Sequence, residues 1–130
     1  MSGHFTIEID SPRKLLRVCL SGFYSVEDVE RYHAAVDEAS IALGGPPSRQ
    51  RMICDVTEMR IQAQDVVAAF QKVMGDPKYR ARRVAFVVAT SLARMQVLRV
   101  AGNRDAQLFE NAREALAWLD SVEGQKASAA

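Results

Sequence analysis

Arg51-Met-Ile-Cys-Asp-Val-Thr-Glu-Met59 is the stretch from which the fold of this chain can be worked out. Its apolar part, Met52 to Val56, predicts a central strand of a sheet. Thr57 and Glu58 predict an acidic, hydroxyl-bearing turn, in which we expect Asp55 to accept backbone N–H groups or to pair with an arginine. A helix should follow, with Gly75 as its left-handed end and an apolar face at helical spacing made by Val66, Val67, Phe70, Val73 and Met74.

The segment before this strand predicts an antiparallel hairpin and a helix. Phe5 to Ile9 alternates apolar and polar residues, and Pro12 suits the second position of a tight turn. Leu16, Val18 and Leu20 then continue the alternation on a second strand. Ser25 is a candidate N-cap for an amphipathic helix that ends at Gly44. We expect the inward stripe of this helix to consist of Val26, Val29, His33, Val36 and Ser40, flanked by Tyr32, Ala39 and Leu43.

The segment after the central strand repeats the strand-helix pattern twice. Val84 to Ala89 is a continuous apolar run, typical of a strand buried on both faces. Thr90 or Ser91 should cap the next helix, which we expect to turn Leu92, Met95, Leu98 and Ala101 inward. Residues 106–109 predict a short last strand, and Asn111 and Glu114 predict the cap of a last helix whose spaced apolar residues are Ala115, Leu116 and Leu119.

The order of these elements predicts one α/β domain over residues 1–123. Its sheet is expected to be mixed, with about five strands: an N-terminal antiparallel hairpin followed by parallel βα units, with four helices in all. A length of 130 residues is enough for one core, and the small, polar residues 124–130 predict a flexible C-terminal tail.

Composition argues against several classes of function. The net charge is +1, and Tyr79 is the only aromatic residue interleaved with the basic residues of 78–83, so we expect no nucleic-acid partner. The longest apolar run, Val84 to Ala89, is far shorter than a membrane span, and the N-terminus lacks the pattern of a signal peptide. Cys19 and Cys54 lie in apolar runs without metal-ligand spacing, which predicts buried free thiols and a cytoplasmic protein.

Catalytic motifs are missing as well. The sequence has no G-x-S-x-G elbow, no phosphate-binding glycine loop and no H-E-x-x-H motif, and His33 has no evident acid or hydroxyl partner. Asp55 and Thr90 invite comparison with a phosphoaccepting receiver domain, but the paired acids that would hold Mg²⁺ are absent. We therefore expect no catalytic residue, no metal, no cofactor and no enzymatic activity.

Four stretches together resemble the STAS domains, the fold of the anti-sigma-factor antagonists, and in particular small bacterial proteins similar to sporulation stage II protein AA. They are Gly22 to Asp28, Met52 to Val56, Val84 to Val88 and Leu108 to Leu119. The resemblance implies a regulatory module that binds a partner protein. In the antagonists a partner kinase phosphorylates a serine near the start of the helix after the central strand. The corresponding positions here are Ala63, Gln64 and Asp65, which bear no hydroxyl, so the phosphorylation switch is not expected.

Two readings of Asp65 stay open: it could imitate a permanently phosphorylated state, or it could simply complement the helix dipole. The subgroup is also similar to Sec14-type domains, which implies an apolar ligand between helices and sheet. Met59, Phe70, Met74 and Met95 are candidates to line such a cavity, although core packing would explain them too.

Parallel strands place their carboxyl ends and the following helix N-termini at one edge of the sheet, where ligands gather. At that edge we expect a binding site for a regulatory protein, or for a lipid or other apolar or anionic small molecule. Homodimerisation through helix faces is compatible with both. The basic residues Lys78, Arg80, Arg82 and Arg83 should lie at the opposite edge, as a solvated face or a binding surface. The candidate site residues are Thr57, Glu58, Gln64, Asp65, Thr90, Ser91 and Arg94.

Overall fold

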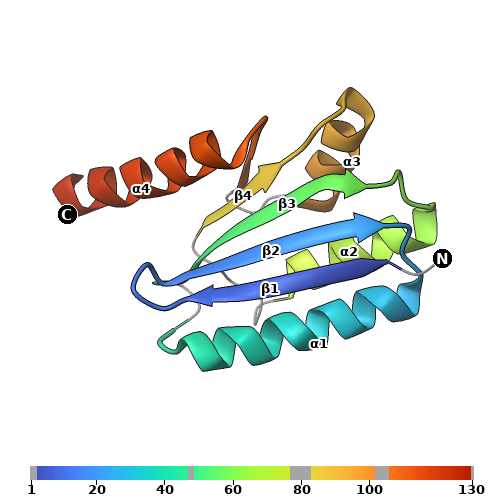
Figure 1. Ribbon diagram of the computed structural model, residues 1–130, viewed down its shortest axis with the longest axis horizontal. Coiled ribbons are helices and arrows are strands. Elements are labelled where there is room, and N and C mark those ends of the chain that lie inside the picture. Colours follow the sequence, from blue (N-terminus) through green and yellow to red (C-terminus); the bar gives the residue numbers. More distant parts are fainter. Residues whose placement is uncertain (1–2, 47–48, 77–82, 102–105, 130) are drawn as a thin grey trace.

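The computed structural model describes residues 3–46, 49–76, 83–101 and 106–129, with 121–129 as backbone alone (Figure 1). Its strands are β1 (His4–Asp10), β2 (Leu15–Gly22), β3 (Arg51–Met59), β4 (Arg83–Val87) and β5 (Ala106–Phe109). Its helices are α1 (Val26–Leu43), α2 (Gln64–Gly75), α3 (Ser91–Ala101) and α4 (Ala112–Ala129). One sheet has the order β1-β2-β3-β4-β5, with β1 antiparallel to β2 and every later pair parallel. The predicted mixed sheet with four helices is therefore confirmed.

The sheet separates two apolar layers. On one side, Val18, Cys54 and Phe86 of three neighbouring strands belong to the large core that also contains buried residues of α1 and α2. On the other side, Ile53 and the buried face of α4 form a smaller core. Figure 1 shows α1 beside β1 and α2 behind the strands, with α4 toward the β4 side of the sheet. Because β3 is covered on both faces, its residues 51–54 are all buried, which explains why Met52, Ile53 and Cys54 follow one another without a polar residue.

The exit of β3 differs from the prediction. Thr57 and Glu58 do not form a turn, because β3 continues to Met59. The pairing of β2 with β3 shifts register between Cys19 and Ser21, so that Ser21 and Gly22 still pair with Glu58 and Met59. Asp55 accepts hydrogen bonds at this irregularity from the backbone N–H of Thr57 (3.0 Å) and from its hydroxyl (2.7 Å). The expected acceptor role of Asp55 is right, but it operates within a bulged strand.

The inward face of α3 was also predicted wrongly. Leu92, Met95 and Leu98 are 64%, 59% and 59% exposed, and of the predicted set only Ala101 is buried. Smaller residues turn inward in their place: Ala93, Val97 and Val100 line a cavity against α2 and the sheet. With Ala101 they follow the i, i+4, i+7, i+8 spacing of one helix face, whereas the larger residues follow i, i+3, i+6 and drift around the helix.

Smaller corrections concern caps, a thiol and the stripe of α1. The stripe consists of Val29, Tyr32, Val36, Ala39 and Leu43, while Val26, His33 and Ser40 lie at its border. Gly75 has no positive φ, and α2 ends through Asp76 in an extended conformation. Cys54 is buried as predicted, but Cys19 is exposed: it lies on the sheet face of the smaller core, beyond Leu15, the residue of β2 that packs in that core.

The turn and cap predictions otherwise hold. The N–H of Lys14 bonds the carbonyl of Ser11 (3.1 Å), which puts Pro12 in the second position of that turn. The hydroxyl of Thr90 caps α3, and the side chain of Asn111 caps α4. The backbone of α4 continues to Ala129, through the segment for which we predicted a tail. The basic residues Lys78, Arg80, Arg82 and Arg104 lie outside the described residues.

Candidate interaction surface at the carboxyl edge of the sheet

The candidate site lies where four parallel strands end. β2, β3, β4 and β5 point the same way, so the helices that follow them all begin at one edge. The loops between β2 and α1 (residues 23–25) and between β3 and α2 (residues 60–63) form the part of this edge in front of the large core. What holds these two loops together decides which side chains the edge presents.

Gln62 joins the two loops. Its side-chain oxygen accepts the backbone N–H of Tyr24 (2.8 Å), and its amide nitrogen donates to the carbonyls of Gly22 (3.0 Å) and Arg60 (2.5 Å). Gln62 and Tyr24 are both buried, so the bond to the N–H of Tyr24 satisfies a backbone group that water reaches poorly. The β3–α2 loop is thereby fixed against the start of α1.

A second glutamine fixes α3 to the same loop. The side chain of Gln96 accepts the backbone N–H of Gln62 (2.9 Å) and donates to its carbonyl (3.0 Å). This pair satisfies both backbone groups of one loop residue, as a neighbouring strand would. The side chain of Gln71 on α2 also donates to the carbonyl of Arg99 (3.1 Å). α3 therefore sits beside α2 with a defined orientation, although its large apolar residues face outward.

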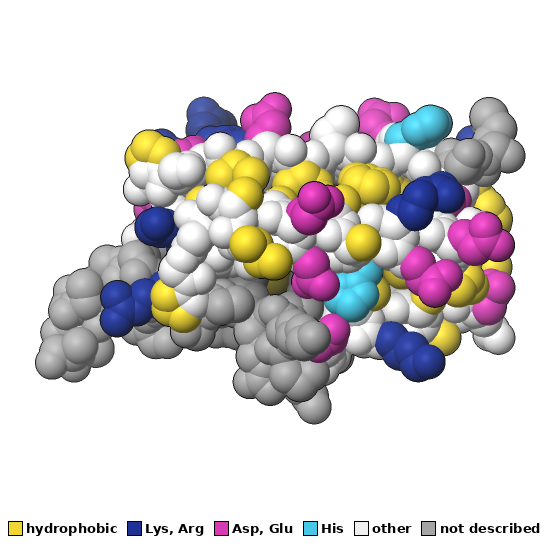
Figure 2. All heavy atoms as spheres, turned by 90° about the horizontal axis from the view of Figure 1, so that it is seen from below, with side chains coloured by type: hydrophobic (Ala, Val, Ile, Leu, Met, Phe, Trp, Pro, Cys, Tyr) yellow, Lys and Arg dark blue, Asp and Glu magenta, His cyan; other side chains and the backbone are white. Residues whose placement is uncertain are grey.

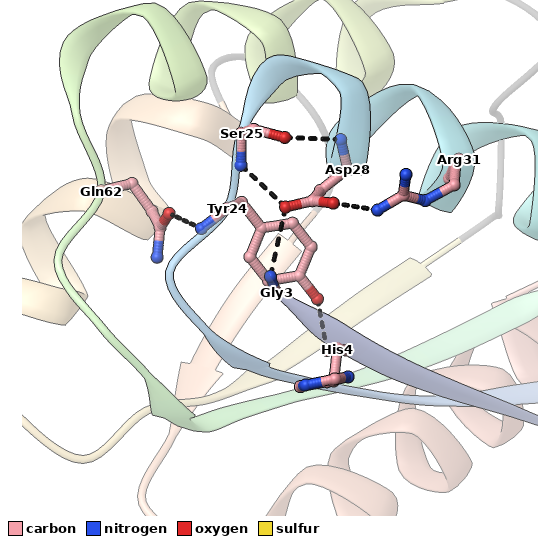
Figure 3. Close-up of polar contacts among 7 residues, drawn as sticks. All are labelled: Gly3, His4, Tyr24, Ser25, Asp28, Arg31 and Gln62. Carbon is pink, nitrogen blue, oxygen red and sulfur yellow. Dashed lines mark hydrogen bonds and ion pairs between the residues drawn. The ribbon is translucent and has the colours of Figure 1, made fainter. Parts of the chain in front are cut away.

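The start of α1 is held by a buried carboxylate, shown in Figure 3. Asp28 accepts the backbone N–H groups of Ser25 (2.9 Å) and Gly3 (3.1 Å), and its own N–H bonds the Ser25 hydroxyl (3.1 Å), which completes a capping box. Arg31 forms an ion pair with it. The backbone N–H groups of Ser25 and Gly3, together with Arg31, lower the pKa of Asp28 below its ordinary value.

Tyr24 fills the space between this carboxylate and Gln62. Its ring is almost fully buried and its hydroxyl donates to the carbonyl of His4 (2.5 Å), the first residue of β1 (Figure 3). Burial, followed by the charge of Asp28, raises the pKa of the Tyr24 phenol. The N-terminal residues of the described chain, the β2–α1 loop and the β3–α2 loop thus share one polar network.

The seven predicted site residues do not come together at one point. Thr57 and Glu58 lie with Asp55 and Cys19 on the sheet face opposite α1 and α2. Partial burial and the carboxylates of Asp55 and Glu58 raise the pKa of the Cys19 thiol. On the other face, Gln64 and Asp65 begin α2, and Thr90, Ser91 and Arg94 begin α3, all exposed. The side chain of Asp65 accepts the N–H of Val66 (2.9 Å), so it satisfies its own helix terminus.

The most distinctive surface feature of this edge was not predicted. Five large apolar side chains are exposed there, and we call them the edge patch: Phe23 (47%), Ile61 (43%), Leu92 (64%), Met95 (59%) and Leu98 (59%). Phe23 adjoins Tyr24, Ile61 adjoins Gln62, and the other three lie on α3 with Gln96, so the hydrogen bonds of Gln62 connect the two loops and the helix that carry them. Arg60, Arg94 and Arg99 are exposed around them.

An apolar cavity lies beneath α3, between α2 and the sheet. Met59, Phe70 and Met74 line it as predicted, but Met95 does not. Its volume is about 70 Å³. Pockets that hold small molecules measure about 300–1,000 Å³. The cavity in this conformation is therefore too small for a lipid chain.

His33 has acidic neighbours that the sequence did not reveal. Its Nε2 atom lies 3.3 Å from Oδ2 of Asp76, the residue after α2, and 3.9 Å from Oδ2 of Asp37 on α1. His33 and Asp76 lie between α1 and α2, away from the carboxyl ends of the strands. Figure 2 shows this side of the molecule, where acidic side chains lie around a histidine. Within the described part of the chain, no three His, Cys, Asp or Glu side chains are placed to hold a metal ion.

Sequence reasoning missed Gln62 and Gln96 because a glutamine in a loop or on a helix carries no periodic signal. The spacing of apolar residues in α3 does indicate which of them are exposed, but the prediction assigned the wrong set to the core. Ala93, Val97, Val100 and Ala101 have the better helical spacing, and giving weight to spacing over side-chain size would have turned Leu92 and Met95 outward.

These features define the fold. The mixed five-stranded sheet with its four helices is an α/β arrangement with a SpoIIAA-like fold. None of the described helices has a segment long and apolar enough to cross a bilayer.

Neither a protein-family model nor a curated protein matches this sequence. Solved structures match its fold. An uncharacterised protein of the DUF3478 family from Shewanella loihica PV-4, with a SpoIIAA-like fold, is similar with a TM-score of 0.66 and 23% identity over 91% of this chain and 94% of that one. An anti-sigma factor antagonist from Mycobacterium paratuberculosis is similar with a TM-score of 0.62 and 13% identity over 89% and 92%.

Proposed function

We propose that this chain is a non-enzymatic interaction module that binds a regulatory protein through the edge patch. The observation that carries the proposal is the exposure of Leu92, Met95 and Leu98 on a helix whose small residues face the core. Single exposed apolar residues are ordinary, but three large ones on one helix, with exposed arginines beside them, are typical of a protein-binding surface. The fold shared with an anti-sigma factor antagonist supports a partner of the regulatory kind.

The edge patch is suited to binding because it is rigidly presented. Gln62 and Gln96 fix the loop and helix that carry it, so little conformational entropy is lost when a partner docks. Regulation by phosphorylation is not part of the proposal, since Ala63, Gln64 and Asp65 begin α2 without a hydroxyl. The carboxylate of Asp65 is engaged by the N–H of Val66, which supports its role as a helix-terminal acid.

A photo-crosslinking experiment in the native host tests the proposal. A photoreactive phenylalanine analogue is placed at Leu92 in one variant and at Ile41 in another. Ile41 is a matched control, because it is 80% exposed but lies near the C-terminal end of α1, away from the edge patch. A discrete adduct with one other protein is expected at position 92 and not at 41. Equal labelling at both positions, or no adduct at position 92, would refute the proposal.

Binding of a lipid or other small molecule is the second candidate, favoured by the apolar lining of the cavity under α3. It requires α3 to move, because about 70 Å³ is too little space for an acyl chain. The Gln62–Gln96 bonds oppose that movement. Native mass spectrometry of freshly purified protein tests it: a lipid-sized adduct supports this candidate, and a bare chain counts against it.

A further inference from the structure

A second surface lies between α1 and α2, and it is acidic where the surroundings of the edge patch are basic. It is a groove of about 620 Å³, which we call the α1–α2 groove. Its residues recur every three or four positions along each helix, as expected for the facing walls of two neighbouring helices. α1 contributes Val26, Val29, Glu30 and His33; α2 and the residue after it contribute Asp65, Ala68, Ala69, Lys72, Val73, Gly75 and Asp76.

The floor of the α1–α2 groove is apolar and its rim is acidic. Val26 and Ala68 are exposed there and leave room for larger side chains. The three carboxylates of Glu30, Asp65 and Asp76 outnumber the single ammonium of Lys72 among the groove residues, so the rim is predominantly acidic. The groove is therefore suited to an apolar helix face with basic flanks.

The outer face of α3 has that character. It presents Leu92, Met95 and Leu98, and the two arginines of the helix, Arg94 and Arg99, are exposed beside them. Ser91 to Ala101 contains no acidic residue. At a rise of about 1.5 Å per residue the apolar stripe is about 9 Å long, and the groove residues from Asp65 to Asp76 extend over about 16 Å. The stripe is thus short enough to lie within the groove.

We propose that the chain self-associates by seating the outer face of α3 of one copy in the α1–α2 groove of a second copy. The inference rests on the proposed function, because it takes α3 as the binding face; a second copy seated there occupies the same face as the regulatory protein, so the two partners bind one copy in turn. Contact between two α3 helices would bring four arginines together without an acid, which opposes that symmetric arrangement. Contact between α3 and the groove instead pairs arginines with carboxylates and covers apolar surface on both sides.

Two charge-reversed variants test the pairing. One carries Arg94→Glu and Arg99→Glu, and the other carries Glu30→Lys and Asp65→Lys; all four residues are exposed. Sedimentation velocity at increasing concentration should show self-association of the native chain. Each variant alone should associate at least about tenfold more weakly, and an equimolar mixture should recover association, since the acidic α3 then meets a basic groove.

The Asp65→Lys change also removes the acceptor of the Val66 N–H, so that variant could lose association through a weakened α2. A third variant therefore tests the groove without changing Asp65. Ala68→Lys adds a long side chain to the groove at an exposed helical position and should abolish association, whereas Ile41→Lys, outside both surfaces, should not change it. A native chain that stays monomeric, an Ala68→Lys variant that associates normally, or a mixture without recovery overturns the inference. A crosslink from Leu92 to a different protein would still uphold the proposed function, so the two can fail separately.

Discussion

Replacing Gln62 by methionine tests whether one buried amide holds the carboxyl edge together. Methionine keeps the length of the side chain but can neither accept the N–H of Tyr24 nor donate to the carbonyls of Gly22 and Arg60. The three lost bonds differ in their consequences. The carbonyl of Gly22 still receives the N–H of Arg60 (3.1 Å), and Arg60 is exposed, so water can reach its carbonyl.

The N–H of Tyr24 has no such replacement, because Tyr24 is only 1% exposed. A buried donor left without a partner costs about 1–3 kcal/mol. We therefore expect Gln62→Met to lower the free energy of unfolding by about 2 kcal/mol. For a domain of this size that corresponds to roughly 8 °C in the midpoint of thermal unfolding.

Urea unfolding followed by circular dichroism measures this change. The midpoint should fall by about 1 M with an unchanged m-value. Gln64→Met is the matched control, since Gln64 is exposed two residues further along and its replacement should stay within about 0.5 kcal/mol of the native chain. If the two variants unfold at the same urea concentration, Gln62 does not hold the edge and the account of the site is wrong.

Two further predictions concern the network in Figure 3. Gly3→Ala should destabilise the chain by about 1–3 kcal/mol in urea unfolding, because the added methyl group would overlap the buried ring of Tyr24; Gly75→Ala, which meets no atom, should be neutral or slightly stabilising. Since the folded pKa of Asp28 is lowered, its stabilisation is present above the ordinary pKa of 3.8 and is lost as the pH falls through the folded value. The difference in unfolding free energy between the native chain and Asp28→Asn should therefore shrink between pH 7 and pH 3, and a constant difference would contradict the lowered pKa.

The overall fold could be predicted because it depends on patterns that survive without tertiary detail. The alternation in β1 and β2, the apolar runs of β3 and β4, and the caps at Ser25, Thr90 and Asn111 are each local signals. The end of β3 could not be predicted in this way. Thr57 and Glu58 have the composition of a turn, and only the shifted pairing with Ser21 and Gly22 keeps them in the strand.

The candidate site was harder to predict because its side chains act across the chain. The side chain of Gln62 bonds the backbone of Tyr24, 38 residues away, and its backbone N–H bonds the side chain of Gln96, 34 residues away. No spacing in the sequence indicates such contacts. The orientation of α3 depends on the same contacts, since its own sequence offers two apolar faces. The core accepts the face with small residues because Phe70 and Met74 of α2 occupy most of the space beneath α3 and leave only a cavity of about 70 Å³. A helix that packs its small residues against the core and exposes its large ones buries less apolar surface within its own chain than the reverse orientation would. Under the proposed function, a partner protein that covers Leu92, Met95 and Leu98 restores that burial.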